Sequence, residues 1–178
     1  DFVEDFTDRN SALVPVTVGP ITGDLTEVQR ITNTNEPTRE YEALLPSAPD
    51  PGAVLARLSE AHILFGAAYA DGKNAKAHAY TTGIRYAERA MAGNPAFLRR
   101  VDAGEPLGDA SAELGRAEIR PMLFWVTGVS YYYKECLGGL GHLLQFRWML
   151  RTRQVMERMM ELDPAYEHGA VPFSLAIY

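Results

Sequence analysis

Few residues in this sequence could do chemistry, and the first candidates are Cys136 and His142. Cys136 is the only cysteine among 178 residues, and a histidine six positions later could act as its base. A helical hydrolase built on this pair would need a third group to orient the base, and only Glu135 lies close in the sequence. The residues between them, Gly138 to Gly141, are typical of a simple turn. We therefore expect a buried, unreactive thiol and a protein that is not an enzyme.

Metal and nucleotide chemistry have less support still. The four histidines (His62, His78, His142 and His168) show no metal-type spacing, and a single cysteine excludes a multi-thiolate zinc site and an internal disulfide. His62 falls in an apolar stripe, where a hydrogen-bonded core imidazole is the usual explanation. The glycines at 138–141 lack the lysine of a phosphate-binding loop and do not follow a strand. No metal or other cofactor is predicted.

The most informative side chains are aromatic. Trp125, Tyr132 and Tyr133 fall in one predicted helix, and Trp148 falls in a later one. If the side of the first helix that carries Phe124 packs inward, the rings at 125, 132 and 133 turn toward a groove. Tyrosine and tryptophan combine apolar area with a polar tip, which suits a ligand-binding wall. We predict a ligand-binding groove at these four residues; the alternative is ordinary core between helices.

Composition restricts the class of protein. Hydrophobic residues make up 47% and charged residues 22%, which is typical of a globular chain, and 178 residues suit one domain. No apolar run approaches the roughly 20 residues of a membrane-spanning helix. The net charge of −6, without a cluster of lysine and arginine, argues against nucleic acid as a partner.

Charge divides the chain near residue 50. Ten acidic residues and three arginines fall in residues 1–50, a net charge of −7, whereas the remaining 128 residues carry +1. Prolines and glycines interrupt residues 1–23, and short helices are predicted at 24–31 and 37–45. We predict an acidic extended arm with short helices at 1–49 and a helical-repeat domain at 50–178. The arm could dock on a basic partner surface, although most charge-rich arms are only solvated.

Helix signals are regular after residue 50. Asp50, Asn94 and Asp163 each precede a proline, an order typical of an N-cap followed by the first helical turn. Apolar residues at three- and four-residue steps predict long helices over 51–70, 75–92, 120–137 and 148–162, and shorter ones from 95, at 110–117 and from 164. No sheet is predicted, so the expected fold class is all-α.

A weak internal repeat indicates how these helices pair. Small residues at Gly66, Gly128 and Ser174 each lie three positions before a large one, at Tyr69, Tyr131 and Ile177. Tetratricopeptide units use this spacing, because the small residue lets two helices approach and the large one fills the groove beside it. The small residues are 62 and 46 positions apart rather than about 34, so the units must carry insertions. We predict degenerate tetratricopeptide-like hairpins stacked as an α-solenoid; the alternative is an irregular helical bundle.

Two stretches resemble a known family. Residues 119–178, above all Leu123-Phe124-Trp125 and the run from Met156 to Ala170, resemble the T-component family associated with TRAP transporters, which are tripartite ATP-independent periplasmic systems. Residues 53–98 resemble the first repeat region of that family, at Ala75-Lys76-Ala77, Tyr86-Ala87 and Asn94-Pro95-Ala96-Phe97. The resemblance covers about two thirds of the chain and does not extend to the arm before residue 47.

The resemblance implies a tetratricopeptide-like periplasmic lipoprotein. In the family such proteins form a homo-oligomer, a trimer, and work with the periplasmic solute-binding protein; hydrophobic ligands are suspected. This chain lacks an N-terminal cysteine for a lipid anchor and stops inside the first helix of another hairpin, so we expect that an end has been cut. Contact with a membrane would depend on the missing lipid anchor.

Two hypotheses of function follow. The first is a non-enzymatic accessory component of a TRAP-type solute uptake system, which binds a hydrophobic or amphipathic ligand, the solute-binding protein, or both. The second is a generic tetratricopeptide adaptor that binds an extended peptide. A peptide groove should offer Asn, Lys or Arg, whereas an apolar ligand needs aromatic walls, so the aromatic helix favours the first.

Overall fold

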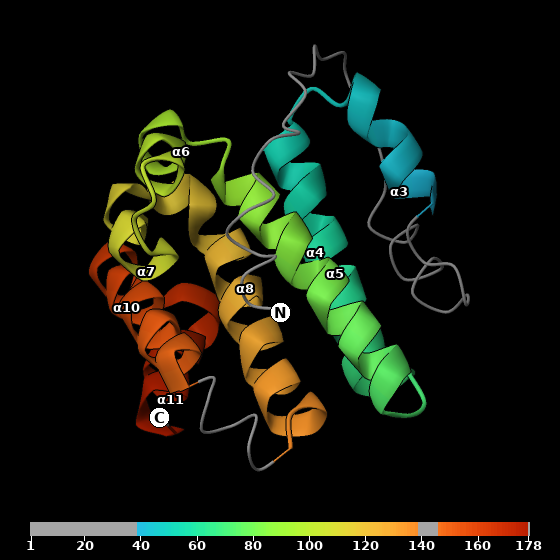
Figure 1. Ribbon diagram of the computed structural model, residues 1–178. Coiled ribbons are helices and arrows are strands. Elements are labelled where there is room, and N and C mark those ends of the chain that lie inside the picture. Colours follow the sequence, from blue (N-terminus) through green and yellow to red (C-terminus); the bar gives the residue numbers. More distant parts are fainter. Residues whose placement is uncertain (1–38, 139–145, 178) are drawn as a thin grey trace.

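The computed structural model describes residues 39–138 and 146–177, and every regular element in these ranges is helical (Figure 1). The predicted all-α fold class is therefore confirmed for them. The predicted short helix at 24–31, most of the acidic arm and His142 lie outside the described residues. In the described ranges, no helix combines the length and apolar character needed to cross a membrane.

The longest helices, α4 (Pro51–Ala68) and α5 (Lys73–Met91), form an antiparallel hairpin. The Asp50 carboxylate accepts a hydrogen bond from the Ala53 backbone N–H at 2.9 Å, so it caps α4 as predicted. Gly72 has a φ of +78°, a conformation that glycine adopts without strain, and it turns the chain into α5. Both helices agree with the predicted ones to within two residues at each end.

The remaining long helices follow one another across the molecule. α8 (Ile119–Tyr131) packs on both helices of the hairpin and continues into a π-helical turn, η4 (Tyr132–Cys136). α10 (Phe146–Leu162) packs on α8, and α11 (Ala170–Ile177) packs on α10. In Figure 1 this order runs from the teal and green hairpin through orange α8 to red α11. The order is compatible with a helical repeat, and the α-solenoid arrangement stays a prediction.

Three glycines allow α4, α5 and α8 to approach one another. A Cβ atom added to Gly66 would lie 2.6 Å from the ring of Tyr80, and one added to Gly83 would lie 2.6 Å from Ile63. A Cβ atom on Gly128 would lie 2.9 Å from the same isoleucine, which is completely buried. The predicted close approach at Gly66 and Gly128 is thus confirmed, and Gly83 is a third contact that the repeat pattern did not indicate.

The large residues of the repeat pattern differ in how they pack. Tyr131 stacks on Tyr80 with ring centroids 5.6 Å apart, so it fills the space beside a close helix contact as expected. Tyr69 does not, since it is 58% exposed and stacks only on Phe65 of its own helix. Tyr69 is the C-cap residue of α4, where the helix ends and no neighbouring helix covers it.

A connector of short helices joins α5 to α8. It contains α6 (Pro95–Asp102), α7 (Leu107–Ala110) and the 3₁₀ turns η2 (Ser111–Glu113) and η3 (Arg116–Glu118). The helical character predicted at 110–117 is confirmed only in part, because that stretch ends α7 and then forms 3₁₀ turns separated by an extended Leu114.

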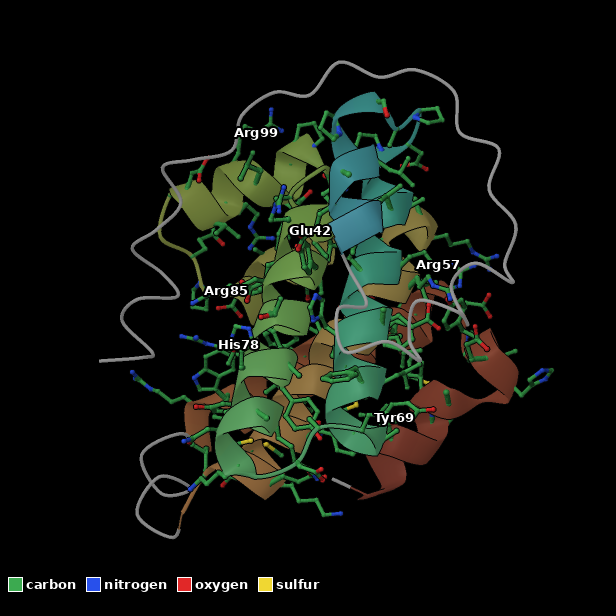
Figure 2. All side chains as sticks on the ribbon, turned by 90° about the vertical axis from the view of Figure 1, so that its right-hand side faces the viewer. Glu42, Arg57, Tyr69, His78, Arg85 and Arg99 are labelled. Carbon is green, nitrogen blue, oxygen red and sulfur yellow. The ribbon has the colours of Figure 1, made fainter. Side chains whose placement is uncertain are left out.

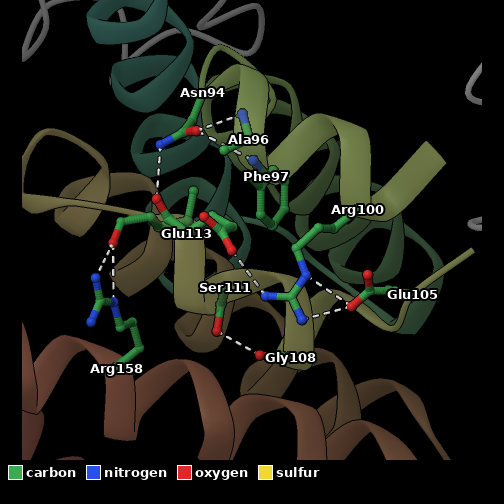
Figure 3. Close-up of polar contacts among 10 residues, drawn as sticks. Asn94, Ala96, Phe97, Arg100, Glu105, Gly108, Ser111, Glu113 and Arg158 are labelled. Atoms are coloured by element: carbon green, nitrogen blue, oxygen red, sulfur yellow. Dashed lines mark hydrogen bonds and ion pairs between the residues drawn. The ribbon is translucent and has the colours of Figure 1, made fainter. Parts of the chain in front are cut away.

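Side chains hold this connector in place (Figure 3). Asn94 caps α6 by accepting from the Ala96 and Phe97 backbone N–H groups at 3.0 and 3.2 Å, and its amide donates to the Glu113 carbonyl at 3.0 Å. Arg158 of α10 donates from Nε and Nη2 to the Leu114 carbonyl at 3.0 and 2.9 Å. The segment around η2 is thus tied both to the N-cap of α6 and to α10.

The helix start predicted at Asp163-Pro164 is wrong. Asp163 accepts from the Ala165 backbone N–H at 3.1 Å, which closes a turn, but α11 begins only at Ala170. Between them Glu167 and His168 have φ values of 47° and 57°, and this left-handed backbone cannot continue a right-handed helix.

The end of the predicted acidic arm packs on the helical domain. α3 (Arg39–Leu44) and η1 (Leu45–Ser47) correspond to the helix predicted at 37–45. Glu42 of α3, labelled in Figure 2, accepts a hydrogen bond from the Tyr86 hydroxyl of α5. Ala48 is fully buried in the cluster that contains this tyrosine.

Replacing Gly83 by alanine should lower the free energy of unfolding by roughly 2–3 kcal/mol. The new methyl group would meet Ile63 at 2.6 Å and the Ser59 backbone oxygen at 3.0 Å, and the backbone can yield only if α4 moves. This strain outweighs the gain of about 1 kcal/mol in helix propensity. Urea unfolding followed by circular dichroism measures the change. Gly138→Ala is the control, because nothing lies within 4 Å of its added Cβ; equal stability of the two variants would refute the contact.

Candidate functional site

Two tryptophans from different helices stack on each other. Trp125 of α8 and Trp148 of α10 have ring centroids 6.2 Å apart and planes inclined by 15°. Trp148 and Tyr132 are partly exposed, and both pack against the core cluster that contains Trp125. The structure therefore brings two of the four predicted groove residues, Trp125 and Trp148, into contact, and Tyr132 packs against the same core; we call Trp125, Tyr132 and Trp148 the aromatic cluster.

The direction predicted for one of the rings needs correction. Trp125 was expected to face a groove, but it is 1% exposed, because α5 and α10 both cover its side of α8. Tyr133 is partly exposed, and its place in the groove stays a prediction. It lies in the π-helical turn, where i→i+5 hydrogen bonding rotates residues away from the positions that α-helical spacing predicts.

A carboxyl group meets the aromatic cluster at Glu88 of α5. Its Oε1 accepts a hydrogen bond from the Trp125 indole N–H at 2.9 Å. Burial raises the pKa of Glu88 to about 7, although the Trp125 hydrogen bond and the positive charges of Arg85 and Arg151 act in the opposite direction. Near neutral pH this carboxyl group is therefore divided between its protonated and charged forms.

The sequence analysis did not identify Glu88, but a signal was present. It is the only acidic residue between Lys73 and Met91, and it lies four residues after Ile84 and three before Met91. These spacings place it on the stripe that was predicted to be buried. A lone acid on a buried stripe requires a hydrogen-bond partner, and the indole of Trp125 provides it.

A second carboxylate holds the π-helical turn against α5. Glu135 accepts from Lys76 Nζ at 2.7 Å and from the Tyr80 hydroxyl at 3.0 Å. The hydrogen bond from Lys76 is the main reason why the pKa of Glu135 lies below its usual range. These contacts fix the end of α8, and with it the start of the turn that carries Tyr132.

The candidate nucleophile is enclosed in the protein. Cys136 is 5% exposed, and its Sγ lies 3.9 Å from the Lys73 carbonyl oxygen, so the predicted burial is confirmed. Burial raises the pKa of the thiol, which disfavours the reactive thiolate. His142 lies outside the described residues, so the proposed pair stays untested.

His62 stacks on Tyr86 with ring centroids 5.5 Å apart, and burial lowers its pKa to about 4. Its Nε2 atom is buried and has no hydrogen-bond partner in the described part of the chain, so the expected hydrogen bond is not formed at that atom. Across residues 39–138 and 146–177, no three histidine, cysteine or acidic side chains are grouped so as to hold a metal ion.

Comparison with known proteins assigns no family. No family model matches the chain, and no curated protein matches it. The resemblance at residues 53–98 and 119–178 therefore stays a prediction, and the site rests on its geometry.

Stability should depend on pH through Glu88. Its pKa is higher in the folded chain than the ordinary value of 4.5, so the folded state holds the proton more tightly and stability falls as pH rises from about 4.5 to about 7. Between about pH 5 and about pH 8 the loss due to Glu88 should reach up to about 3 kcal/mol. Glu88→Gln keeps an acceptor for Trp125 but cannot ionise.

Urea unfolding of both proteins at the two pH values measures this contribution. Glu88→Gln should be less sensitive to pH than the unmodified chain by that amount. Glu157→Gln, which alters an exposed carboxylate of α10, should behave like the unmodified chain. The same pH dependence in the unmodified chain and in Glu88→Gln would contradict the assignment.

Proposed function

We propose that this chain is a non-enzymatic, helical-repeat accessory component of a TRAP-type periplasmic solute uptake system. It binds a hydrophobic or amphipathic ligand at the aromatic cluster, the periplasmic solute-binding protein, or both. It acts as a homo-oligomer, and a lipid anchor outside this chain would provide its contact with the membrane.

The observation that carries the proposal is the make-up of the aromatic cluster. The buried Trp125 forms its base, the partly exposed Trp148 and Tyr132 lie at its edge, and Glu88 supplies one polar group. Apolar rings with a few placed polar groups are typical of sites for small organic ligands. The glycine contacts of α8 and the Glu135 hydrogen bonds pre-organise the helix that carries two of these rings.

The resemblance to the T-component family supports the same part of the molecule. Its second stretch, residues 119–178, comprises α8, α10 and α11, and the cluster joins the first two of these helices. The run from Met156 to Ala170 covers the end of α10 and the left-handed turn before α11.

A peptide-binding adaptor is the second proposal, because one observation favours it. His78, Arg85 and Arg89 are exposed on α5, and Figure 2 shows the first two on the same side of that helix. The guanidinium groups of the two arginines can bind the carboxylates of a peptide.

Binding of the neutral apolar dye N-phenyl-1-naphthylamine tests the ligand site. The dye should bind with increased fluorescence, and Trp148→Ala should weaken binding about tenfold, since covering such a ring contributes about 1–2 kcal/mol. Trp148→Phe keeps an apolar ring and should lose less, which separates loss of the site from loss of the fold. Tyr69→Ala removes a 58% exposed aromatic side chain elsewhere and should bind normally. No binding, or equal losses at Trp148 and Tyr69, would reject the site.

Native mass spectrometry tests the assembly. The purified protein should appear as a homo-oligomer with a retained small ligand, or should form a complex when a TRAP solute-binding protein is added. If the protein binds neither a small ligand nor the solute-binding protein, but binds an extended acidic peptide, the result supports the peptide-binding adaptor instead.

A further inference from the structure

Arg151 lies on the side of α10 that faces the core. It follows Trp148 by three residues and precedes Val155 by four, so the three share one face of the helix. Val155 is completely buried, and Arg151 is partly buried. A guanidinium group beside apolar surface is partly screened from water, so an anion that reaches it is bound more strongly than at a fully exposed arginine.

No protein group in the described ranges accepts a hydrogen bond from Arg151 or forms an ion pair with it. The other arginines of the same helix differ in this respect. Arg158 donates to the Leu114 carbonyl, and Arg153 pairs with Glu157 at 2.9 Å. Arg151 therefore has donors available for an acceptor that the described residues do not supply.

Glu88 is near Arg151 without neutralising it. The charge of Arg151 lowers the pKa of Glu88, which shows that the two groups are close, but they form no ion pair. The groups that act on Glu88 are Arg85 of its own helix, Trp125 of α8 and Arg151 of α10. Because burial dominates over all three, part of the Glu88 population is uncharged near neutral pH and leaves Arg151 without a counter-ion.

Apolar surface lies next to this guanidinium. Trp148, one helical turn before Arg151, stacks on Trp125 and is partly exposed. A ligand that covered the ring could reach Arg151 with its polar end, since side chains three apart on a helix are neighbours. Guanidinium groups bind carboxylates through two parallel hydrogen bonds, which gives both strength and orientation.

We propose that the ligand is an amphiphile with a carboxylate head group, which pairs with Arg151 while its apolar part covers Trp148. This inference rests on the proposed ligand-binding function and specifies the chemical class of the ligand. A bound carboxylate would repel the charged form of Glu88, so binding should be accompanied by uptake of a proton at Glu88. The amphiphile therefore binds more tightly as pH falls through neutrality.

Octanoate and 1-octanol test this inference, because they share an apolar chain and differ in the head group. Trp125 and Trp148 are the only tryptophans of the chain, so intrinsic fluorescence reports directly on the site. At about pH 6 octanoate should bind about tenfold more tightly than 1-octanol, and at about pH 8 the preference should be several-fold smaller. In Glu88→Gln the preference should be the same at both pH values.

Substitutions of arginine separate the head-group contact from general effects. Arg151→Gln should abolish the preference for octanoate and leave 1-octanol binding unchanged. Arg151→Lys keeps the charge and should retain part of the preference, which shows that the site has not collapsed. Arg153→Gln removes the same charge from the exposed side of α10 and should behave like the unmodified chain.

The outcomes distinguish the two proposals. Equal binding of octanoate and 1-octanol, or a preference that survives Arg151→Gln, overturns the carboxylate assignment and leaves an apolar ligand site in place. Failure of both compounds to bind at either pH overturns the ligand-binding function together with this inference.

Discussion

The close contact of α4, α5 and α8 at three glycines is the constraint on which the rest of the structure depends. Gly66, Gly83 and Gly128 leave room for Tyr80 and for the buried Ile63, and a methyl group at any of them would overlap a neighbour. Helix backbones that approach this closely form many dispersion contacts and exclude water from both surfaces. The same contact fixes the rotation of α8 about its axis, and that rotation directs Trp125 toward the region between α5 and α10.

Two glutamates within this frame have pKa values shifted in opposite directions. Glu135 is held by Lys76 and Tyr80, and its pKa is lowered, so it is a stable charged tie between α5 and the end of α8. Among the described residues, Glu88 accepts a hydrogen bond only from the Trp125 indole N–H, and burial raises its pKa to about 7. One glutamate is thus a charged structural contact, and the other changes its charge near neutral pH. The difference lies first in the burial of Glu88 and then in the Lys76 hydrogen bond that Glu135 alone accepts.

The proposed ligand site lies at the junction of elements that are distant in the sequence. α5 contributes Glu88, α8 contributes Trp125, and α10 contributes Trp148 and Arg151. Such a junction can change its ligand by single substitutions, because each helix supplies one or two side chains to a shared frame. The connector between α5 and α8 supports this arrangement, since Arg158 ties it to α10 by two hydrogen bonds to one carbonyl.

The sequence by itself determined the long helices, because their signals are local. Asp50 and Asn94 cap helices through backbone groups two or three residues away, and the apolar period marks the length of α4 and α5. Only the tertiary structure decided which way Trp125 points, that Glu88 is its partner, and that α11 starts at Ala170 rather than at Pro164. The first two depend on which helices cover a given face, which is set by contacts between residues far apart in the chain. The third depends on the left-handed backbone of Glu167 and His168, which apolar periodicity does not indicate.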